Sequence, residues 1–255
     1  MFTQIAPAPA GAIFIPVLHP VTFPMARYAI TDIHGCARTF KALVLEQLHL
    51  RKDDELYLLG DYVNKGPDSK GVIDFILHLQ KQHYQVHCLR GNHDQMLLNA
   101  ARAGERALLL TPDEKKLTYQ NFRISDITHL PDKYVNFLNS LPYYLELPDY
   151  YLVHAGFDFK QADIFKDTDA MMNIRNYKVD WEKLSDKRLL HGHTPTALSI
   201  ILQGVDQQKQ CLNLDAGCAY YKNAALGNLV ALDLDAMQLY KQCNLDKPYP
   251  INIKS

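Results

Sequence analysis

The fold of this chain is decided by the stretch Tyr28-Ala29-Ile30-Thr31-Asp32-Ile33-His34-Gly35, where a short apolar run ends in polar residues. The apolar run predicts a buried strand over 28–31, and the helical spacing of apolar residues from Phe40 to Leu48 predicts a helix after it. The same order returns twice, because apolar runs at 56–59 and 86–89 are each followed by a polar loop and a helix pattern. This repetition indicates an α/β fold with a largely parallel sheet, whose polar loops gather at one edge.

The rest of the chain is predicted to add a helical cap and a second group of strands. Residues from about 95 to 149 contain two helix-start patterns, at 111–114 and at 131–133, and we expect this region to cover the polar loops. Two further apolar runs end in His154 and in His191-Gly192-His193. The short apolar segments at 198–202, 211–214, 229–234 and 237–240 then indicate an antiparallel second half, since their connections look too short for helices.

Length and composition agree with one globular domain, which we place at 26–245 with a C-terminal tail at 246–255. The chain has 255 residues, of which 47% are hydrophobic and 22% are charged. Residues 1–25 contain five prolines and no charged residue, which fits neither a membrane helix nor a secretory signal. We therefore expect a disordered tail or a natural start at Met25. An extension that docks on an apolar patch is the alternative.

Charge and cysteine content limit the expected partners and location. The formal net charge is −1, so the chain has no general attraction for a nucleic acid duplex or an anionic membrane. A local basic pocket would still suffice for a small anionic substrate. Five cysteines without a regular framework predict reduced thiols and a cytoplasmic protein.

Side chains that bind metal ions follow the predicted strands. Asp32 and His34 are expected to point to the same side of an extended backbone, because one residue separates them. Oxygen and nitrogen donors together suit manganese, iron or zinc. Six donors are too many for one tetrahedral ion with an open position, but they fit two ions that share a bridging carboxylate, which we assign to Asp61. The six candidate ligands are Asp32, His34, Asp61, Asn92, His154 and His193.

With these motifs in this order, the sequence resembles the calcineurin-like metallophosphoesterases, and among them the bacterial serine/threonine-type phosphoprotein phosphatase (PPP) family. The resemblance spans residues 26 to about 235 and implies a sandwich of two mixed β-sheets flanked by helices. It implies that Asp32, His34 and Asp61 hold a first ion, while Asp61 joins Asn92, His154 and His193 at a second. Pro195 stands where other branches have a second histidine, which favours phosphate monoesters over diesters. The motifs are 31–36, 60–68, 89–94, 153–156, 191–195 and 213–218.

The resemblance also implies a mechanism in which a hydroxide between the two ions attacks phosphorus and His93 protonates the leaving oxygen. An ordinary histidine pKa of about 6.5 suits that acid. Asn64 stands where the family has an aspartate that orients this histidine, so a weaker acid and a preference for good leaving groups are expected. Lys65 stands where the family has a phosphate-binding arginine, and Arg175 resembles the second one.

Three more residues complete the predicted site. Tyr220 follows a loop that should border it and is a candidate substrate contact. Asp94 and Asp215 are candidates for hydrogen bonds that orient the ligand histidines, although Asp215 could equally cap a turn.

Three functions remain open on the sequence alone. The first is a phosphatase that uses two divalent ions, manganese before iron or zinc, on Ser/Thr or Tyr phosphoproteins or small phosphoesters. The second is hydrolysis of dinucleoside polyphosphates such as diadenosine tetraphosphate, whose leaving group needs little acid and so suits Asn64. The third is an inactive metal-binding scaffold. The sequence leaves the oligomeric state open.

Overall fold

The first of two β-sheets has five strands in the spatial order β3-β2-β1-β8-β9. The computed structural model describes residues 24–247, so the predicted N-terminal tail lies almost wholly outside the described residues. β1 pairs in parallel with β2, and β2 with β3, while β8 and β9 are antiparallel to their neighbours. The strands are β1 (Arg27–Ile30), β2 (Glu55–Leu58), β3 (Gln85–Cys88), β8 (Asn228–Asp233) and β9 (Gln238–Cys243).

The second sheet has four strands in the order β4-β5-β6-β7 and is also mixed. β5, β6 and β7 are parallel, whereas β4 forms an antiparallel hairpin with β5. The strands are β4 (Tyr144–Glu146), β5 (Tyr150–Val153), β6 (Arg188–His191) and β7 (Cys211–Asn213). The predicted pair of mixed sheets with flanking helices is confirmed.

Alternate residues of the central strand belong to two different hydrophobic cores. Tyr28 and Ile30 face a core shared with the helices, and Ala29 faces a core between the two sheets. Leu152 and Leu190 of the second sheet pack into that same inter-sheet core. This alternation follows from the two-residue period of a strand and stacks the sheets face to face.

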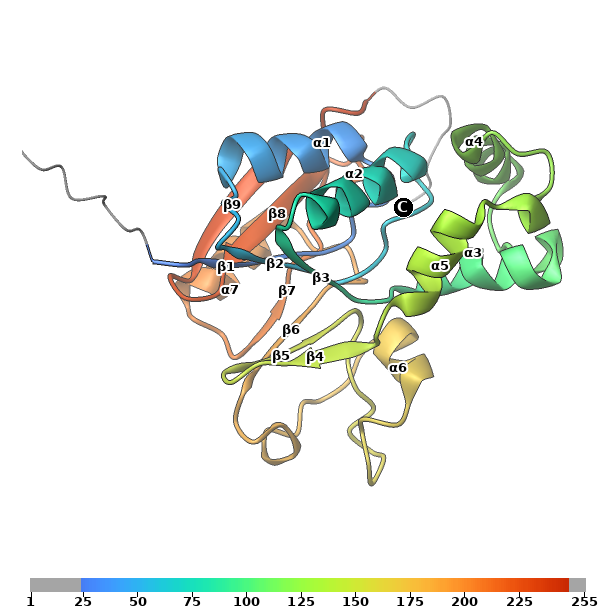
Figure 1. The fold of residues 1–255 in the computed structure, drawn as a ribbon. Helices are drawn as coiled ribbons and strands as arrows, with labels where there is room; N and C mark the ends of the chain where they lie inside the picture. Colours follow the sequence, from blue (N-terminus) through green and yellow to red (C-terminus); the bar gives the residue numbers. More distant parts are fainter. Residues whose placement is uncertain (1–23, 248–255) are drawn as a thin grey trace, which may run out of the picture.

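Helices α1 and α2 cover the outer face of the first sheet, and α3, α4 and α5 gather beside it (Figure 1). No helix in the described part of the chain has the length and apolar character needed to span a membrane. Short 3-10 turns occur at 105–107, 127–129 and 182–184. The helices are α1 (Ala37–Ala42, continued by a π-helical turn, Leu43–Gln47), α2 (Ser69–Lys81), α3 (Asn92–Ala103), α4 (Pro112–Phe122), α5 (Asp132–Ser140), α6 (Thr168–Asn173) and α7 (Leu198–Asp206).

Two predictions about the second half of the chain are wrong. Residues 198–202 were expected to be a strand, but they begin helix α7, where Ile201 and Val205 turn the same face inward. Residues 211–213 pair in parallel with β6, not antiparallel, because α7 is the crossover that parallel neighbours need. A five-residue apolar run does not by itself distinguish helix from strand. β8 and β9 are antiparallel, as expected.

The region expected to form the cap is not helical throughout. Its last part, Tyr144–Glu146, is strand β4, and Tyr144 pairs with Val153 in the second sheet. At the other end of the domain, Asp246 is buried and accepts hydrogen bonds from the backbone of Arg38 and Thr39. The chain is therefore still packed against α1 where the C-terminal tail was expected to begin.

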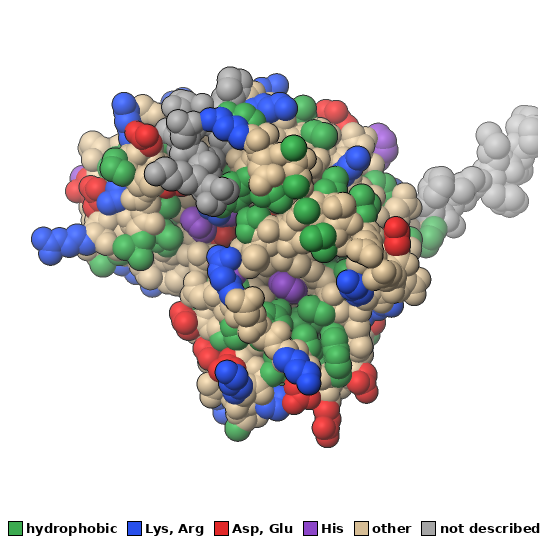
Figure 2. All heavy atoms as spheres, turned by 180° about the vertical axis from the view of Figure 1, so that it is seen from behind, with side chains coloured by type: hydrophobic (Ala, Val, Ile, Leu, Met, Phe, Trp, Pro, Cys, Tyr) green, Lys and Arg blue, Asp and Glu red, His purple; other side chains and the backbone are tan. Residues whose placement is uncertain are grey.

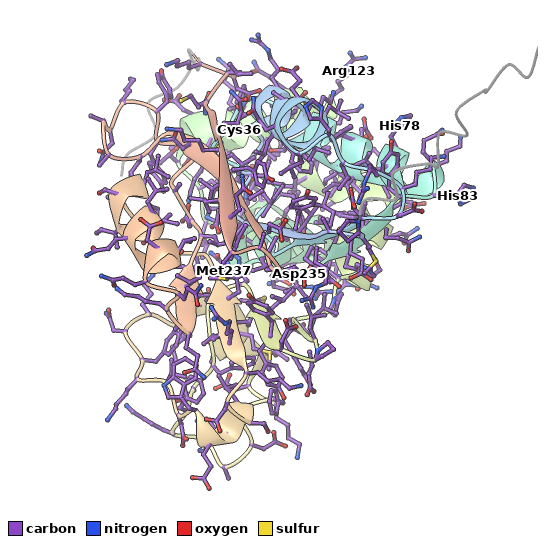
Figure 3. The ribbon with its side chains drawn as sticks, turned by 90° about the vertical axis from the view of Figure 1, so that its left-hand side faces the viewer. Cys36, His78, His83, Arg123, Asp235 and Met237 are labelled. Atoms are coloured by element: carbon purple, nitrogen blue, oxygen red, sulfur yellow. The ribbon has the colours of Figure 1, made fainter. Side chains whose placement is uncertain are left out.

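The carboxyl end of β1 and the turn between β8 and β9 lie at opposite ends of the first sheet. Figure 3 shows Cys36 near one end and Asp235 with Met237 near the other. Asp235 forms an ion pair with Arg27 at the start of β1, whereas Cys36 follows the end of that strand. The predicted site residues lie at the Cys36 end. Figure 2 shows acidic and basic side chains interspersed over one face, as a net charge near zero suggests.

Candidate metal centre

The loops that follow β1 and β2 are joined by backbone hydrogen bonds. The amide of His34 donates to the carbonyl of Asp61 at 2.8 Å, and the amide of Gly66 donates to the carbonyl of His34 at 2.7 Å. The amide of Asp32 reaches the carbonyl of Gly60 at 3.3 Å. Two loops from neighbouring parallel strands are thus held as one unit, which brings their polar side chains together.

The sequence analysis assumed an extended backbone at Asp32 and His34. The structure shows a different conformation there. Their φ angles are 52° and 47°, in the left-handed region that residues other than glycine rarely adopt. Such conformations cost on the order of 1–3 kcal/mol each and cluster at functional sites. The side chains still converge, with His34 Nε2 at 3.7 Å from Asp32 Oδ1. Left-handed φ angles occur at Asp32, His34, Asp61, Asn64, Lys65 and His193 among the predicted site residues.

Backbone carbonyls fix the orientation of two histidines around Asp61. Nδ1 of His34 lies 3.1 Å from the carbonyl of Val63, and Nδ1 of His154 lies 2.9 Å from that of Leu59. With Nδ1–H donating to a carbonyl, Nε2 of each ring keeps its lone pair. These two Nε2 atoms lie 3.4 and 3.6 Å from the same oxygen, Oδ2 of Asp61. Asp61 therefore occupies the place between both imidazoles that a bridging carboxylate requires.

The remaining predicted ligands meet beside His154. Asn92 Oδ1 lies 3.1 Å from His154 Nε2 and 3.1 Å from His193 Nδ1. Oδ2 of Asp32 accepts from the amide of His193 at 2.9 Å and also from the hydroxyl of Thr31. All six candidate ligands are thus brought to one place from separate strand ends.

The donor set fits divalent cations. Asp32 Oδ1 and His193 Nε2 are buried and have no hydrogen-bond partner among the described residues. Burial, and then the neighbouring charge of Asp32, raise the pKa of Asp61 to about 8. Burial lowers the pKa of His193 to about 3 and that of His34 well below its usual value. Buried carboxylates that repel one another beside neutral imidazoles are the environment that bound cations would stabilise.

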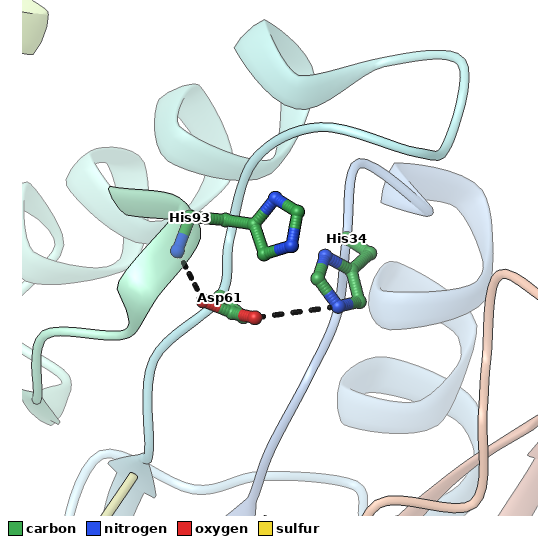
Figure 4. A group of neighbouring side chains, drawn as sticks. All are labelled: His34, Asp61 and His93. Carbon is green, nitrogen blue, oxygen red and sulfur yellow. Dashed lines mark hydrogen bonds and ion pairs between the residues drawn. The ribbon is translucent and has the colours of Figure 1, made fainter. Parts of the chain in front are cut away.

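Two groups of donor atoms with a mutual separation within 4.8 Å share Asp61. One group is Asp32, Asp61 and His154, and the other is His34, Asp61 and His93. The second group includes His93, which the sequence analysis treated as an acid and not as a ligand. Figure 4 shows the His34 and His93 rings next to one another, above the Asp61 carboxylate. Their centroids are 4.9 Å apart, edge to face.

His93 does not have the ordinary pKa that the sequence analysis assumed. Burial, and then the charge of Lys65, lower its pKa well below the usual value. Its backbone amide donates to Asp61 Oδ1 at 2.9 Å, which fixes it beside the centre. The imidazole is therefore neutral near pH 7 in this environment.

Asn64 contacts His93 through a short chain of hydrogen bonds. Its amide group lies 3.2 Å from His93 Nδ1 and 3.4 Å from the Thr118 hydroxyl. The single hydroxyl proton of Thr118 goes to the carbonyl of Glu114 at 2.8 Å. The amide nitrogen of Asn64 is the atom beside His93 Nδ1 and donates to it, which leaves the proton of the neutral ring on Nε2, while the Thr118 hydroxyl lies beside Asn64 Oδ1. Thr118 of helix α4 thus contacts Asn64, and Asn64 in turn orients His93.

The predicted phosphate-binding residues occupy two depths. Lys65 Nζ lies 3.0 Å from His34 Nε2 and 5.0 Å from the centre of the Tyr220 ring, so both point into the centre. Although burial opposes it, Tyr220 and Asp61 raise the pKa of Lys65, which keeps its positive charge. Arg175 is exposed, and its Nη1 lies 3.2 Å from Thr194 Oγ1, beside His193. Lys65 is therefore the more buried of the two, and Arg175 lies at the rim.

Asp94 and Asp215 are both buried, but their hydrogen bonds go to the backbone. Asp94 accepts from the amides of Asp61 at 2.7 Å and Tyr62 at 3.0 Å, so it holds the loop after β2 and not a histidine ring. Asp215 accepts from the amide of Gly217 at 2.8 Å. Burial, and then the charge of Asp32, raise the pKa of Asp215 well above its usual value.

Two glycines support the centre in a way that the sequence analysis missed. A Cβ on Gly91 would overlap Oδ1 and the backbone nitrogen of Asp61, and a Cβ on Gly192 would overlap Oδ2 of Asp32. Both glycines stand directly before a predicted ligand, which is a signal the sequence does contain. The contact of Thr118 with Asn64 joins residues 54 positions apart and carries no such signal.

Comparison with known proteins agrees with this geometry. Residues 25–226 match the model of the calcineurin-like phosphoesterase family. A symmetrical bis(5'-nucleosyl)-tetraphosphatase of Nitrosococcus oceani is 40% identical over 122 residues, which cover 44% of this chain and 40% of the relative. A protein of the same name from Chromobacterium violaceum is 28% identical over 197 residues, covering 74% of this chain and 64% of the relative. The chain thus spans less than two thirds of the length of these curated relatives.

Solved structures share the fold at lower sequence similarity. A protein serine/threonine phosphatase from Saccharomyces cerevisiae superposes with a TM-score of 0.60 and 14% identity, covering 89% of this chain and 81% of that one. The match of the family model covers most of the chain and agrees with the convergence of the strand-end motifs. The chain therefore belongs to the calcineurin-like phosphoesterase family.

Proposed function

We propose that this chain hydrolyses dinucleoside polyphosphates and cleaves diadenosine tetraphosphate symmetrically into two molecules of ADP. The observation that carries this choice is the environment of His93, whose Nδ1 lies 3.2 Å from a neutral amide and whose partly buried ring has a lowered pKa. Such a group is a poor acid for a serine or threonine alkoxide. A nucleoside diphosphate ends in a phosphate whose pKa is about 6, so it departs with little protonation. The curated relatives named tetraphosphatases support the same choice.

This proposal reverses the order of substrates that the sequence alone favoured. Phosphoproteins came first there because of the resemblance to the PPP family, and dinucleoside polyphosphates came second. Asn64 was already the feature that fitted the second class better. The lowered pKa of His93 adds an independent physical reason.

The proposed metal ligands form two sets that share Asp61. We assign Asp32, His34 and Asp61 to one divalent ion, and Asp61, Asn92, His154 and His193 to the other. The two ions, with manganese as the first candidate for this mixed donor set, would activate a water and offset charge on the phosphates. Asp61 and Asp32 hold the centre together by accepting from the amides of His93 and His193.

The remaining residues act on the substrate itself. Lys65 and Tyr220 face the space beside His34, where a phosphate group would meet the partly buried ammonium. Arg175 lies at the rim and can bind the next phosphate group of the polyphosphate substrate through two parallel hydrogen bonds. His93, held by Asn64, is the group available to donate a hydrogen bond to the leaving oxygen.

A direct substrate comparison tests the proposal. Purified full-length protein with manganese is assayed against diadenosine tetraphosphate, a phosphoserine peptide and a phosphotyrosine peptide, and nucleotide products are separated by chromatography. We expect ADP as the only nucleotide product and a kcat/KM at least about tenfold above that for either peptide, a difference of about 1.4 kcal/mol. Faster release of phosphate from a peptide, or cleavage into ATP and AMP, would contradict the proposal.

The role of Thr118 gives a second prediction for the same reaction. Thr118→Val keeps the shape but removes the hydroxyl, so the Asn64 amide loses one partner. We expect kcat on diadenosine tetraphosphate to fall about three- to tenfold, as for loss of one hydrogen bond of about 1 kcal/mol, with KM changed less than twofold. Thr118→Ser should restore kcat, because it restores the hydroxyl. Equal losses in the valine and serine variants would show that only packing is at stake.

A further inference from the structure

A groove of about 680 Å³ opens beside the proposed metal centre, in the segment between β5 and β6. Its walls include three aromatic rings and three cations, here called the aromatic groove: Phe159, Lys160, Arg175, Tyr177, Lys178 and Trp181. Two carboxylates, Asp158 and Asp180, also line it. Asp158 already accepts from the backbone of Lys160 and from Gln161 Nε2. Cations therefore outnumber the carboxylates, and one carboxylate is engaged.

The groove is attached to the metal centre at two points. Tyr177 donates its hydroxyl proton to the carbonyl of Ala155 at 3.1 Å, directly after His154. Arg175 contacts Thr194 Oγ1 at 3.2 Å, directly after His193. Arg175 thus belongs both to the rim of the centre and to the wall of the groove. A ligand that enters the centre can continue into the groove without leaving the range of Arg175.

Two of the rings, Tyr177 and Trp181, are partly exposed and suit a flat ligand, while Phe159 is buried. Tyr177 and Phe159 pack with centroids 5.8 Å apart at an angle of 38°, and the Tyr177 ring lies against Gly156, where a Cβ would overlap it. Trp181 is partly exposed at the same groove. Aromatic side chains stack on bases for about 1–3 kcal/mol per base, and cations beside them bind the phosphates.

A second groove near the centre lacks these features. It has about 310 Å³ and begins at Asn92 between α3 and α6. Its described lining contains no aromatic ring, lysine or arginine. Between the two grooves, only the aromatic groove combines ring faces with positive charge.

We propose that the aromatic groove binds one nucleoside diphosphate half of the substrate, with the base against Trp181 and Tyr177 and the phosphates against Arg175 and Lys178. This inference rests on the proposed function, because it names where that substrate lies. The volume suits a nucleoside with its attached phosphates, since small-molecule sites commonly hold 300–1,000 Å³.

The chain provides its own reporter for this site, because Trp181 is its single tryptophan. Full-length protein with manganese is titrated with ADP, which carries a base, and with pyrophosphate, which does not. We expect ADP to change the tryptophan emission in a saturable way and pyrophosphate to change it by less than a quarter as much. No change with ADP up to millimolar concentration would overturn the proposal.

Binding to variants, measured by equilibrium dialysis of labelled ADP, gives a readout that does not depend on the emission. We expect Trp181→Ala and Lys178→Ala each to weaken ADP binding at least about fivefold and Trp181→Phe to stay within twofold. Lys209→Ala removes an exposed lysine outside the groove lining and should leave binding unchanged. Circular dichroism checks that the variants are folded. Unchanged binding in folded Trp181→Ala would overturn the proposal, as would a phosphotyrosine peptide that displaces ADP at lower concentration than unlabelled ADP does.

These outcomes separate the groove from the reaction. Symmetrical cleavage of diadenosine tetraphosphate together with ADP binding that ignores Trp181 would refute the groove and leave the proposed function intact. Saturable ADP binding that depends on Trp181, without cleavage of that substrate, would refute the proposed function and keep the groove as a nucleotide site.

Discussion

Replacing Asp61 with asparagine is expected to lower kcat on diadenosine tetraphosphate on the order of 10³-fold, or about 4 kcal/mol of transition-state stabilisation. The reason is its position, with Oδ2 at 3.4 Å from His34 Nε2 and 3.6 Å from His154 Nε2. Asparagine keeps the size but removes the charge that both proposed metal positions share. We also expect bound manganese to fall by at least one ion per chain, measured by atomic emission after dialysis.

Asp113→Asn is the matched control, because it makes the same change on an exposed residue of α4. It should leave kcat and manganese content unchanged. An Asp61→Asn protein that retains both ions and more than a tenth of wild-type kcat would remove Asp61 from the bridging role.

Replacing Gly91 with alanine is expected to lower kcat roughly 100-fold by steric means alone. The new Cβ would overlap Oδ1 and the backbone nitrogen of Asp61, so the carboxylate must move. A displacement of about 1 Å at a catalytic centre can cost about 10²-fold in rate. The φ angle of Gly91 is −96°, which alanine adopts freely, so the effect comes from contact and not from backbone strain. Steady-state kinetics measure the loss of kcat, and thermal unfolding measures any loss of stability.

Gly204→Ala controls for the general cost of adding a methyl group. The nearest atom at that position belongs to the flexible side chain of Leu212, and the site lies in helix α7. We expect its kcat to stay within twofold and its stability to hold or rise, since alanine favours a helix by about 0.5–1 kcal/mol over glycine. A Gly91→Ala protein with kcat as high as this control would show that the centre tolerates movement of Asp61.

The convergence of the proposed ligands could be predicted from the sequence, because parallel strands end at a common edge of a sheet. Asp61 and Asn92 follow two neighbouring strands of one sheet, and His154 and His193 follow two neighbours in the other. What the pattern could not supply was backbone conformation within the loops. Asp32 and His34 have left-handed φ angles, which depend on hydrogen bonds to the loop after β2.

Errors arose where a short segment takes its structure from distant neighbours. The apolar run at 198–202 is compatible with a strand or with a helix. Only the parallel pairing of β6 with β7 requires a helix between them. Burial had a similar effect on chemistry. The pKa of His93 depends on residues from several elements, so it is lower than the value of about 6.5 for an unperturbed histidine.

The most direct test of the account is the anomalous scattering of a crystal grown with manganese. The account predicts two peaks, about 3.5–4 Å apart, on either side of the Asp61 carboxylate. Asn92, His154 and His193 should surround one peak, and Asp32 with His34 the other. A single peak, or an empty centre with Asn92 and His154 turned outward, would contradict the two-metal site on which the proposed reaction depends.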